Sequence, residues 1–227
     1  MKFHKGELVN LLLSVLLLGI LFSFFGILGA PDLAEAFRYF LFVTFFVGIS
    51  FALHELAHKF VAEKYGCISI YTIDPRAMLF SIILTFLSFG SIIFAAPGYV
   101  RILKTSRIGR SFAELSREEI GKIAIAGPLA NLILSILFAI LLKTSKIFFY
   151  PFQINLFLGI FNLLPFPPLD GSKVLGWSLS SWSISFLAFI LLSFLYSDLL
   201  SWFLSFLVLA AIIFLVIQKF SPRIDKF

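Results

Sequence analysis

The sequence predicts an all-α polytopic membrane protein with about six transmembrane helices and a re-entrant or strand-like insert in its first half. Of its 227 residues, 60% are hydrophobic and 13% are charged, and the mean hydropathy is +1.05. A soluble domain is closer to half apolar and a quarter charged, and it could not bury this much apolar surface. We therefore expect residues 1–227 to form a single domain embedded in the lipid bilayer.

The basic residues flank the apolar runs and predict the topology. The formal net charge is +6, but the lysines and arginines form no stripe with interleaved aromatic residues, so we expect no nucleic-acid partner. With both termini in the cytoplasm, Arg38, Lys143 and Lys146 lie outside and the other 15 of the 18 Lys+Arg lie inside. This bias follows the positive-inside rule and favours a multi-pass protein of the cell membrane.

Residues 8–29 form the first uncharged run, after a short basic start with Lys2 and Lys5. A helix of this length crosses a bilayer core of about 30 Å. The run is too long for the apolar part of a cleaved signal peptide. We therefore expect the first transmembrane helix here, with its N-terminus in the cytoplasm.

A second uncharged run covers residues 39–53, after a polar turn over residues 30–38. We expect the second helix to continue through His54 and to stop at Gly66, because glycine is typical of helix ends. His54 follows Arg38 by 16 residues, or roughly 24 Å along a helix. It should therefore lie within the membrane, nearer the cytoplasmic side.

Two lysines follow in the same helix. We expect Lys59 and Lys64 to extend along the apolar surface towards the cytoplasm, as long basic side chains commonly do near helix ends.

The insert over residues 67–97 departs from a simple series of helices. β-branched residues alternate over 67–73, before a turn at Asp74-Pro75, which indicates a short strand. Residues 79–97 are apolar, and two interpretations are open: one more crossing, or a re-entrant hairpin that turns near Gly90. A single crossing would place basic residues outside, whereas a hairpin keeps both flanks in the cytoplasm. We therefore favour the hairpin.

The rest of the chain predicts a basic cytoplasmic loop over residues 99–122 and four more crossings. Within the loop, Ser116 and Glu119 have the spacing of a capping box, which predicts a helix start. The crossings are expected over residues 123–142, 152–170, 182–196 and 199–217, with an outer loop over 143–151, a polar link over 171–180 and a basic tail of Lys219, Arg223 and Lys226.

The stretch His54-Glu55-Leu56-Ala57-His58 has the spacing HExxH. On a helix its two histidines point the same way, one turn apart, and two neutral imidazoles so placed can bind one zinc ion. Glu55, beside them, can hold a metal-bound water. Each ionisable side chain in a membrane helix costs roughly 2.5 kcal/mol or more. A divalent cation would offset this cost, and a buried hydrogen-bonded cluster is the alternative.

A catalytic zinc usually keeps three protein ligands and one open position, so a third ligand is needed. Most of the remaining acidic residues fall in the basic loop, in the tail or outside, whereas Asp74 lies in the linker after the helix and Asp170 ends an inward-going apolar span. Prolines at 165, 167 and 168 prevent a regular helix before Asp170 and allow the backbone to line a cavity, and Gly171 permits a sharp turn. Asp170 is therefore favoured, with a cytosol-facing acid as the alternative. No suitably placed glutamate follows His58, which disfavours a zinc protease of another kind.

Two asparagines are further candidates for the site. Asn162 precedes the proline-broken stretch, and its amide can donate to a developing oxyanion or hold a substrate strand. Asn131 lies four residues after Gly127. It can belong to the site or form a hydrogen bond between membrane helices, and both roles remain open.

Together these motifs resemble the site-2 proteases, which are intramembrane zinc metalloproteases of the M50 type. The resemblance rests on HELAH at 54–58, AGPLAN at 126–131 and FNLLPFPPLDG at 161–171, in this order on successive apolar segments, and it covers residues 39–171. The family often has glycine where this chain has Ala57, which is a small change. The resemblance implies His54, His58 and Asp170 as ligands of one zinc per chain, Glu55 as the catalytic base and Asn162 as a contact to substrate or transition state.

The expected function is hydrolysis of peptide bonds within the transmembrane segments of other membrane proteins, in the manner of regulated intramembrane proteolysis. The partners are then a transmembrane protein substrate and the lipid bilayer. The segment 67–73 or 79–97 is expected to offer an edge for an unwound substrate. The alternative is a non-catalytic metal-binding scaffold or transporter with the same fold, although every catalytic group is present.

Overall fold

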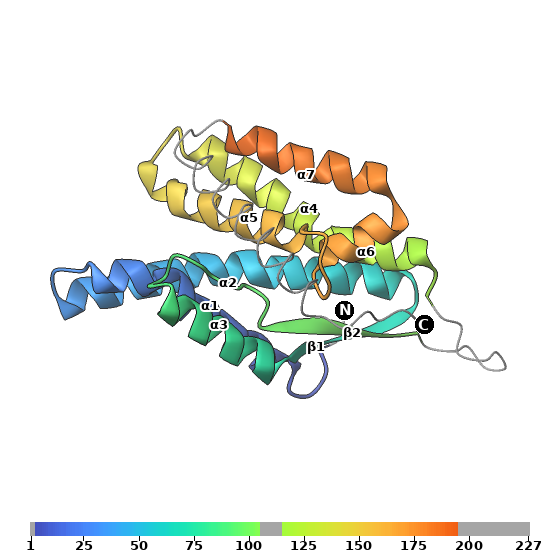
Figure 1. The fold of residues 1–227 in the computed structure, drawn as a ribbon, viewed down its shortest axis with the longest axis horizontal. Helices are drawn as coiled ribbons and strands as arrows, with labels where there is room; N and C mark the ends of the chain where they lie inside the picture. Colours follow the sequence, from blue (N-terminus) through green and yellow to red (C-terminus); the bar gives the residue numbers. More distant parts are fainter. Residues whose placement is uncertain (1–2, 105–114, 195–227) are drawn as a thin grey trace. The chain divides into compact units, whose positions relative to one another are not determined.

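The computed structural model describes residues 3–104 and 115–194 of the chain. These residues are mostly helical, with one small sheet of two strands (Figure 1). The chain divides into two compact units, Met1–Phe189 and Ile190–Phe227. The elements described below belong to the first unit, except the C-terminal end of helix α7.

Seven α-helices, one short 3-10 helix and two strands are present among the described residues. They are α1 (Glu7–Leu28), α2 (Leu33–Lys64), β1 (Cys67–Ile73), α3 (Pro75–Leu87), β2 (Gly98–Lys104), α4 (Arg117–Leu141), η1 (Lys146–Phe148), α5 (Phe149–Asn162), α6 (Asp170–Trp177) and α7 (Leu179–Ser193). Within the described ranges, α1, α2 and α4 are long and apolar enough to cross a membrane. The predicted crossing over 199–217 and the basic tail lie outside the described residues.

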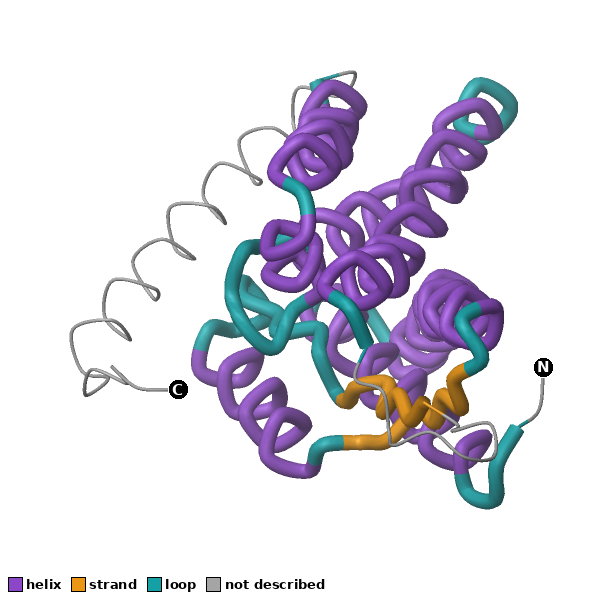
Figure 2. Tube along the Cα trace, turned by 90° about the vertical axis from the view of Figure 1, so that its right-hand side faces the viewer, coloured by secondary structure: helices purple, strands orange, loops and turns teal. Residues whose placement is uncertain are grey.

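Helix α2 is the central element, and it packs against α1, α4, α5 and β1 (Figures 1 and 2). It begins earlier than predicted, at Leu33, because the Asp32 side chain accepts a hydrogen bond from the Glu35 backbone N–H at 2.8 Å. Glu35 also pairs with Arg38 at 2.6 Å, so the polar stretch forms the first helical turns. The helix ends at Lys64, just before Gly66 with φ +70°, where the stop was predicted.

One prediction for α2 was wrong. Lys59 does not extend to the surface: it is buried, with 3% of its area exposed, and it forms an ion pair with Glu7 of α1 at 2.8 Å. The partner lies 52 residues earlier in the chain, so the helical pattern around Lys59 gave no sign of it.

The two strands pair in antiparallel orientation, with Tyr71 opposite Val100. This confirms the strand predicted over 67–73. Residues 99–104, however, were predicted as part of a basic loop and instead form most of β2. Apolar Val100 and Ile102 alternate there with Arg101, and this period of two is typical of a strand with one buried face. Residues 105–114 of the predicted loop lie outside the described part of the chain.

Residues 75–97 double back on themselves near Gly90, where the reversal was predicted. The outgoing arm is helix α3, and the backbone turns at Phe89 and Gly90, which have φ of +52° and +80°. The returning arm is extended and runs along the helix, where Ser81 Oγ donates to the Phe94 carbonyl at 2.7 Å. Its end meets the start of the hairpin, because the Asp74 N–H donates to the Pro97 carbonyl at 2.9 Å.

In the C-terminal half, the predicted helix start and the predicted proline break are both present, but the segment after the break differs from the prediction. Ser116 and Glu119 form the predicted capping box at the start of α4. Helix α5 ends at Asn162, and residues 163–169 are not helical, as the prolines predicted. The predicted polar link over 171–180 is instead largely helix α6. Its first residue is Asp170, and an acidic side chain is favourable in a first helical turn.

Candidate metal centre

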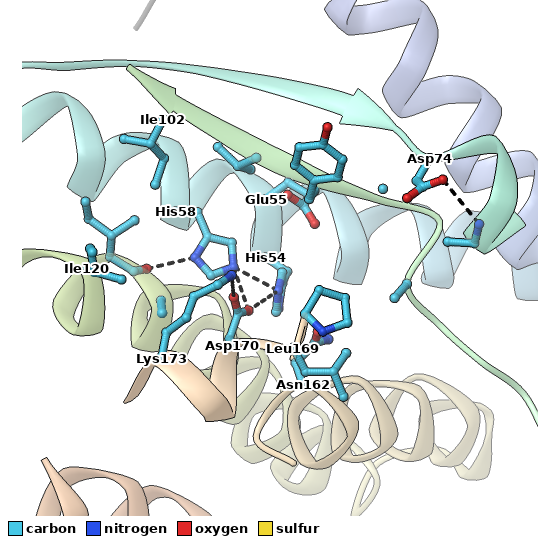
Figure 3. A pocket seen from close by; sticks show the side chains of 18 of the residues that line it. His54, Glu55, His58, Asp74, Ile102, Ile120, Asn162, Leu169, Asp170 and Lys173 are labelled. Atoms are coloured by element: carbon cyan, nitrogen blue, oxygen red, sulfur yellow. Dashed lines mark hydrogen bonds and ion pairs between the residues drawn. The ribbon is translucent and has the colours of Figure 1, made fainter. Parts of the chain in front are cut away.

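Three buried side chains from two helices meet at one point (Figure 3). His54 and His58 come from α2, and Asp170 comes from the first position of α6. The two Nε2 atoms lie 3.0 Å apart. The Asp170 Oδ2 atom lies 3.4 Å from the Nε2 of His54 and 3.0 Å from the Nε2 of His58. The structure thus brings together the three residues that the sequence selected as metal ligands.

The hydrogen bonds of the two histidines determine which ring nitrogen faces the centre. His54 Nδ1 lies 2.6 Å from Asn131 Oδ1, and His58 Nδ1 lies 2.8 Å from the Ile123 carbonyl. Both partners are oxygen acceptors, so each Nδ1 carries the proton. Each Nε2 therefore presents a lone pair, as in metal-binding histidines whose other nitrogen is held by an acceptor.

The three donor atoms fit a zinc ion. A tetrahedral zinc site with bonds of about 2.0–2.1 Å separates its ligand atoms by about 3.3 Å, close to the three distances described above. Two imidazole lone pairs and a carboxylate oxygen would repel one another at this spacing, and a divalent cation removes that repulsion. Nitrogen and carboxylate donors are also ligands that zinc accepts.

Helix α4 approaches the centre through Gly127. A Cβ atom built on Gly127 would lie 2.4 Å from His58 Nε2 and 2.6 Å from His54 Nε2. Any side chain at this position would enter the space between the ligands. The close approach of α4 to α2 that Gly127 permits therefore occurs at the metal centre itself.

Asn131 links the centre to a polar network between helices. Its Nδ2 donates to Asn155 Oδ1 at 3.0 Å and to the Ser50 carbonyl at 3.3 Å, which leaves Oδ1 facing His54. Asn155 in turn donates to Ser50 Oγ at 2.8 Å. Asn131 thus fills both of the roles left open by the sequence. The role of Asn155 was not predicted from the sequence, although an amide in an otherwise apolar helix indicates a buried hydrogen bond.

Asp170 is held by its own helix and by the preceding loop. Lys173 Nζ donates to Asp170 Oδ1 at 3.2 Å, which leaves Oδ2 for the centre. A Cβ atom on Gly171 would lie 2.1 Å from the Leu163 carbonyl, so this glycine permits close approach of α6 to the loop instead of the predicted sharp turn. Lys173 was missed because the segment was predicted to be a polar link. Only on a helix does the spacing of three residues place Lys173 beside Asp170.

A cavity of about 570 Å³ opens beside the three donors (Figure 3). Glu55 and Asn162 both line it, so the five residues that the resemblance implied as ligands, base and substrate contact border one space. Asn162 Nδ2 donates to the Leu158 carbonyl at 2.9 Å. Asp74 lines the cavity too, but its carboxylate accepts from the Arg76 N–H at 2.9 Å and caps α3. The opposite wall includes residues of β2.

Comparisons with known proteins agree with this chemistry. Residues 40–147 and 142–188 match the model of peptidase family M50. A protein provisionally named zinc metalloprotease MJ0611, from Methanocaldococcus jannaschii, is 39% identical over 190 residues, which cover 81% of this chain and 90% of the relative. YwhC of Bacillus subtilis, with the same provisional name, is 33% identical over 56% of this chain and 64% of its own length.

A third relative, zinc metalloprotease MJ0392 of Methanocaldococcus jannaschii, is 30% identical over 60% of this chain and 33% of its own length. No solved structure matches the chain significantly. The family match covers more than half of the chain and includes every residue of the metal centre, and it favours an enzyme over a non-catalytic scaffold or transporter. The chain therefore belongs to peptidase family M50 and is a membrane-associated zinc metalloprotease.

Proposed function

We propose that this metalloprotease is an intramembrane endopeptidase that hydrolyses peptide bonds within transmembrane segments of other membrane proteins. The observation that carries the proposal is the position of the metal centre inside α2, a helix long and apolar enough to cross a membrane. His54 lies roughly 24 Å along the helix from Arg38 and roughly 15 Å from Lys64. Substrates that reach it are therefore expected to come from the membrane.

His54, His58 and Asp170 are assigned as the zinc ligands. Zinc in such a site lowers the pKa of a bound water and polarises the carbonyl that is attacked. Asn131, Ile123 and Lys173 orient these ligands through the hydrogen bonds described above. The oriented ligands leave the cavity side of the centre for water and substrate.

Glu55 is assigned as the general base. It directly follows His54 in the chain and lines the same cavity, with its carboxylate beside the histidines (Figure 3). In this role Glu55 takes the proton from the attacking water and later passes it to the leaving amine. Asn162, on another wall of the cavity, is assigned to contact the substrate or the developing oxyanion.

The substrate is expected to pair with β2. A helical substrate shields its own carbonyl groups, so it must unwind before cleavage, and an unwound backbone can pair with a free strand edge. Gly98, Tyr99, Val100 and Ile102 of β2 line the cavity, whereas β1 packs on α1 and α2. Among the described residues no strand pairs with the second edge of β2, and the substrate is proposed to pair there. The proposed edge therefore moves from residues 67–73 or 79–97, as first expected, to residues 98–104.

The proposed topology keeps six crossings, the re-entrant hairpin predicted over 79–97, which starts with α3 at Pro75, and both termini in the cytoplasm. It is proposed for one protease domain over residues 1–227 whose core is 39–171. The charge bias described above supports it. The reversal at Gly90 supports the hairpin, because both of its ends then lie on one side of the membrane.

The first prediction tests the catalytic role of Glu55. The Glu55→Gln variant should keep one zinc per chain and lose cleavage of a model single-span substrate by at least about 100-fold, the effect of removing a general base. A chelator should stop wild-type cleavage, and added zinc should restore it. Glu63→Gln, on the same helix but away from the cavity, is the control. Zinc in both proteins with equal cleavage would remove Glu55 from the mechanism, and no cleavage of any membrane substrate by the wild type would contradict the proposed function.

The second prediction concerns Gly127. The Gly127→Ala variant should bind zinc about 10- to 100-fold more weakly, the range for changes that disturb ligand orientation, because the new methyl group meets both Nε2 atoms. Zinc affinity can be measured by competition with a chromophoric chelator. Gly176→Ala is a matched control, since nothing lies within 4 Å of a Cβ there. Wild-type affinity in both variants would show that the ligands do not need this space.

The third prediction tests the β2 edge. Proline at Tyr99 or Val100 removes one backbone N–H, and adjacent strand residues direct theirs to opposite edges. The variant that leaves the β1–β2 pairing intact should raise KM about tenfold, the equivalent of one hydrogen bond. Hydrogen exchange over residues 67–73 identifies which variant that is. Unchanged KM in that variant, with zinc retained, would exclude pairing at this edge.

The fourth prediction tests the topology by cysteine labelling of intact cells in a Cys67→Ser background. A membrane-impermeant maleimide should label Ser145→Cys directly. It should label Arg76→Cys and Glu118→Cys only after the cells are permeabilised, because the hairpin returns the chain to the same side. Labelling of Arg76→Cys and Glu118→Cys from opposite sides would instead establish a single crossing.

A further inference from the structure

A buried ion pair lies next to the metal-binding stretch and has no part in the proposed chemistry. Lys59 directly follows His58, and its Nζ lies 2.8 and 3.0 Å from the two carboxylate oxygens of Glu7. Only 3% of Lys59 and 2% of Glu7 are exposed. Charged residues are almost never buried to this degree without a specific set of partners.

The partners of this pair come from the sheet and from the start of the chain. Lys59 Nζ also donates to the Ser69 carbonyl of β1 at 2.6 Å. Glu7 Oε1 accepts from the Tyr71 N–H of β1 at 3.1 Å, and Glu7 Oε2 accepts from the His4 N–H at 2.9 Å. All three ammonium protons and both carboxylate oxygens thus have partners, and three of these bonds involve backbone groups.

A second set of contacts holds β1 to the same two helices. The Tyr71 hydroxyl lies 2.8 Å from Ser14 Oγ of α1, and the Tyr71 ring packs edge-on against Phe51 of α2, with 5.7 Å between the centroids. Asn10 Nδ2 donates to the Tyr71 carbonyl at 3.4 Å. Burial raises the pKa of the Tyr71 phenol, and either hydroxyl can donate in the bond to Ser14.

The ion pair connects the metal-binding stretch to the wall of the cavity. Ser69 lies opposite Ile102 in the sheet, and Tyr71 lies opposite Val100. Val100 and Ile102 line the cavity together with the metal-binding side chains. The route from His58 to this wall therefore passes through Lys59 and Glu7, then through β1 to β2, with hydrogen bonds or a covalent link at each step.

We propose that Glu7 and Lys59 are positioning residues that set the register between the β1–β2 sheet and the metal-binding stretch of α2, and so select which substrate peptide bond reaches the metal centre. The proposal rests on the proposed pairing of substrate with β2. An apolar contact would hold the strand equally close but would allow it to slide, whereas bonds to the Ser69 carbonyl and the Tyr71 N–H fix one register. Buried ion pairs often add little stability over an apolar replacement, which is consistent with a role in specificity.

Two double variants separate register from charge pairing. Glu7→Leu/Lys59→Met replaces the pair by apolar side chains, which remove its bonds without leaving an unpaired charge. Glu7→Lys/Lys59→Glu keeps opposite charges in contact, but position 7 then cannot accept from the Tyr71 N–H and position 59 cannot donate to the Ser69 carbonyl. The control is Glu35→Gln/Arg38→Met, which removes an exposed ion pair from the other end of α2.

The full chain, loaded with zinc in proteoliposomes, is tested on a single-span substrate whose product ends are read by mass spectrometry. Both double variants should keep one zinc per chain, lose kcat/KM about tenfold or more, as expected for a misplaced substrate, and spread the cut over neighbouring bonds. The control should cut the wild-type bond at the wild-type rate. In both double variants, hydrogen exchange over residues 98–104 should be faster than in the wild type.

Several results would overturn this role. If the apolar variant cuts the wild-type bond at the wild-type rate, the pair does not set the register. If the charge-reversed variant does so, the pair acts only through the attraction between opposite charges. Loss of zinc or of cooperative unfolding in both variants would make the pair a determinant of folding. If the wild type cuts no membrane substrate, the proposed function fails, and exchange over 98–104 still decides: unchanged exchange in both variants would contradict the positioning role.

Discussion

The convergence of two imidazoles and a carboxylate in an apolar protein is the constraint on which the rest of this structure depends. Each group is expensive to bury, and each is stabilised by one specific bond pointing away from the centre: His54 to Asn131, His58 to the Ile123 carbonyl and Asp170 to Lys173. These bonds leave three lone-pair donors facing one another within 3.0–3.4 Å. A divalent cation satisfies all three at once.

Helix α4 provides both the space and the orientation that this arrangement needs, and it does so from one face. Gly127 leaves room for the two Nε2 atoms, and Asn131, one turn later, accepts from His54 Nδ1. Residues four apart lie on the same side of a helix, so the motif AGPLAN is a geometric unit. Each role would fail if its own residue were moved along the chain by one position, because the residue would then face another side of the helix.

The parts of the fold that were predicted correctly are those determined by local sequence. The HExxH spacing, the capping box at Ser116 and the proline break before Asp170 each act within a few residues. Asp170 was identified because few acidic residues are available in an apolar chain. The parts that were missed depend on distant partners: Lys59 pairs with Glu7, Asn155 bonds to Asn131, and β2 is a strand because it pairs with β1. A lysine with a hidden carboxylate partner has the same local pattern as one that reaches the surface.

The division of the site between a helix and a sheet follows from the same cost of unpaired polar groups. A substrate backbone that unwinds in an apolar environment exposes N–H and C=O groups that lipid cannot satisfy. In the proposed mechanism the edge of β2 satisfies them, and it does so through the backbone, which all substrates share. Substrate side chains then matter mainly through how easily a segment unwinds. The register between β2 and α2 determines which peptide bond is cut. In the proposed role, the buried hydrogen bonds of Glu7 and Lys59 to β1 set that register. A protease of this design would accept many sequences and still cut each at a defined distance from its entry to the sheet.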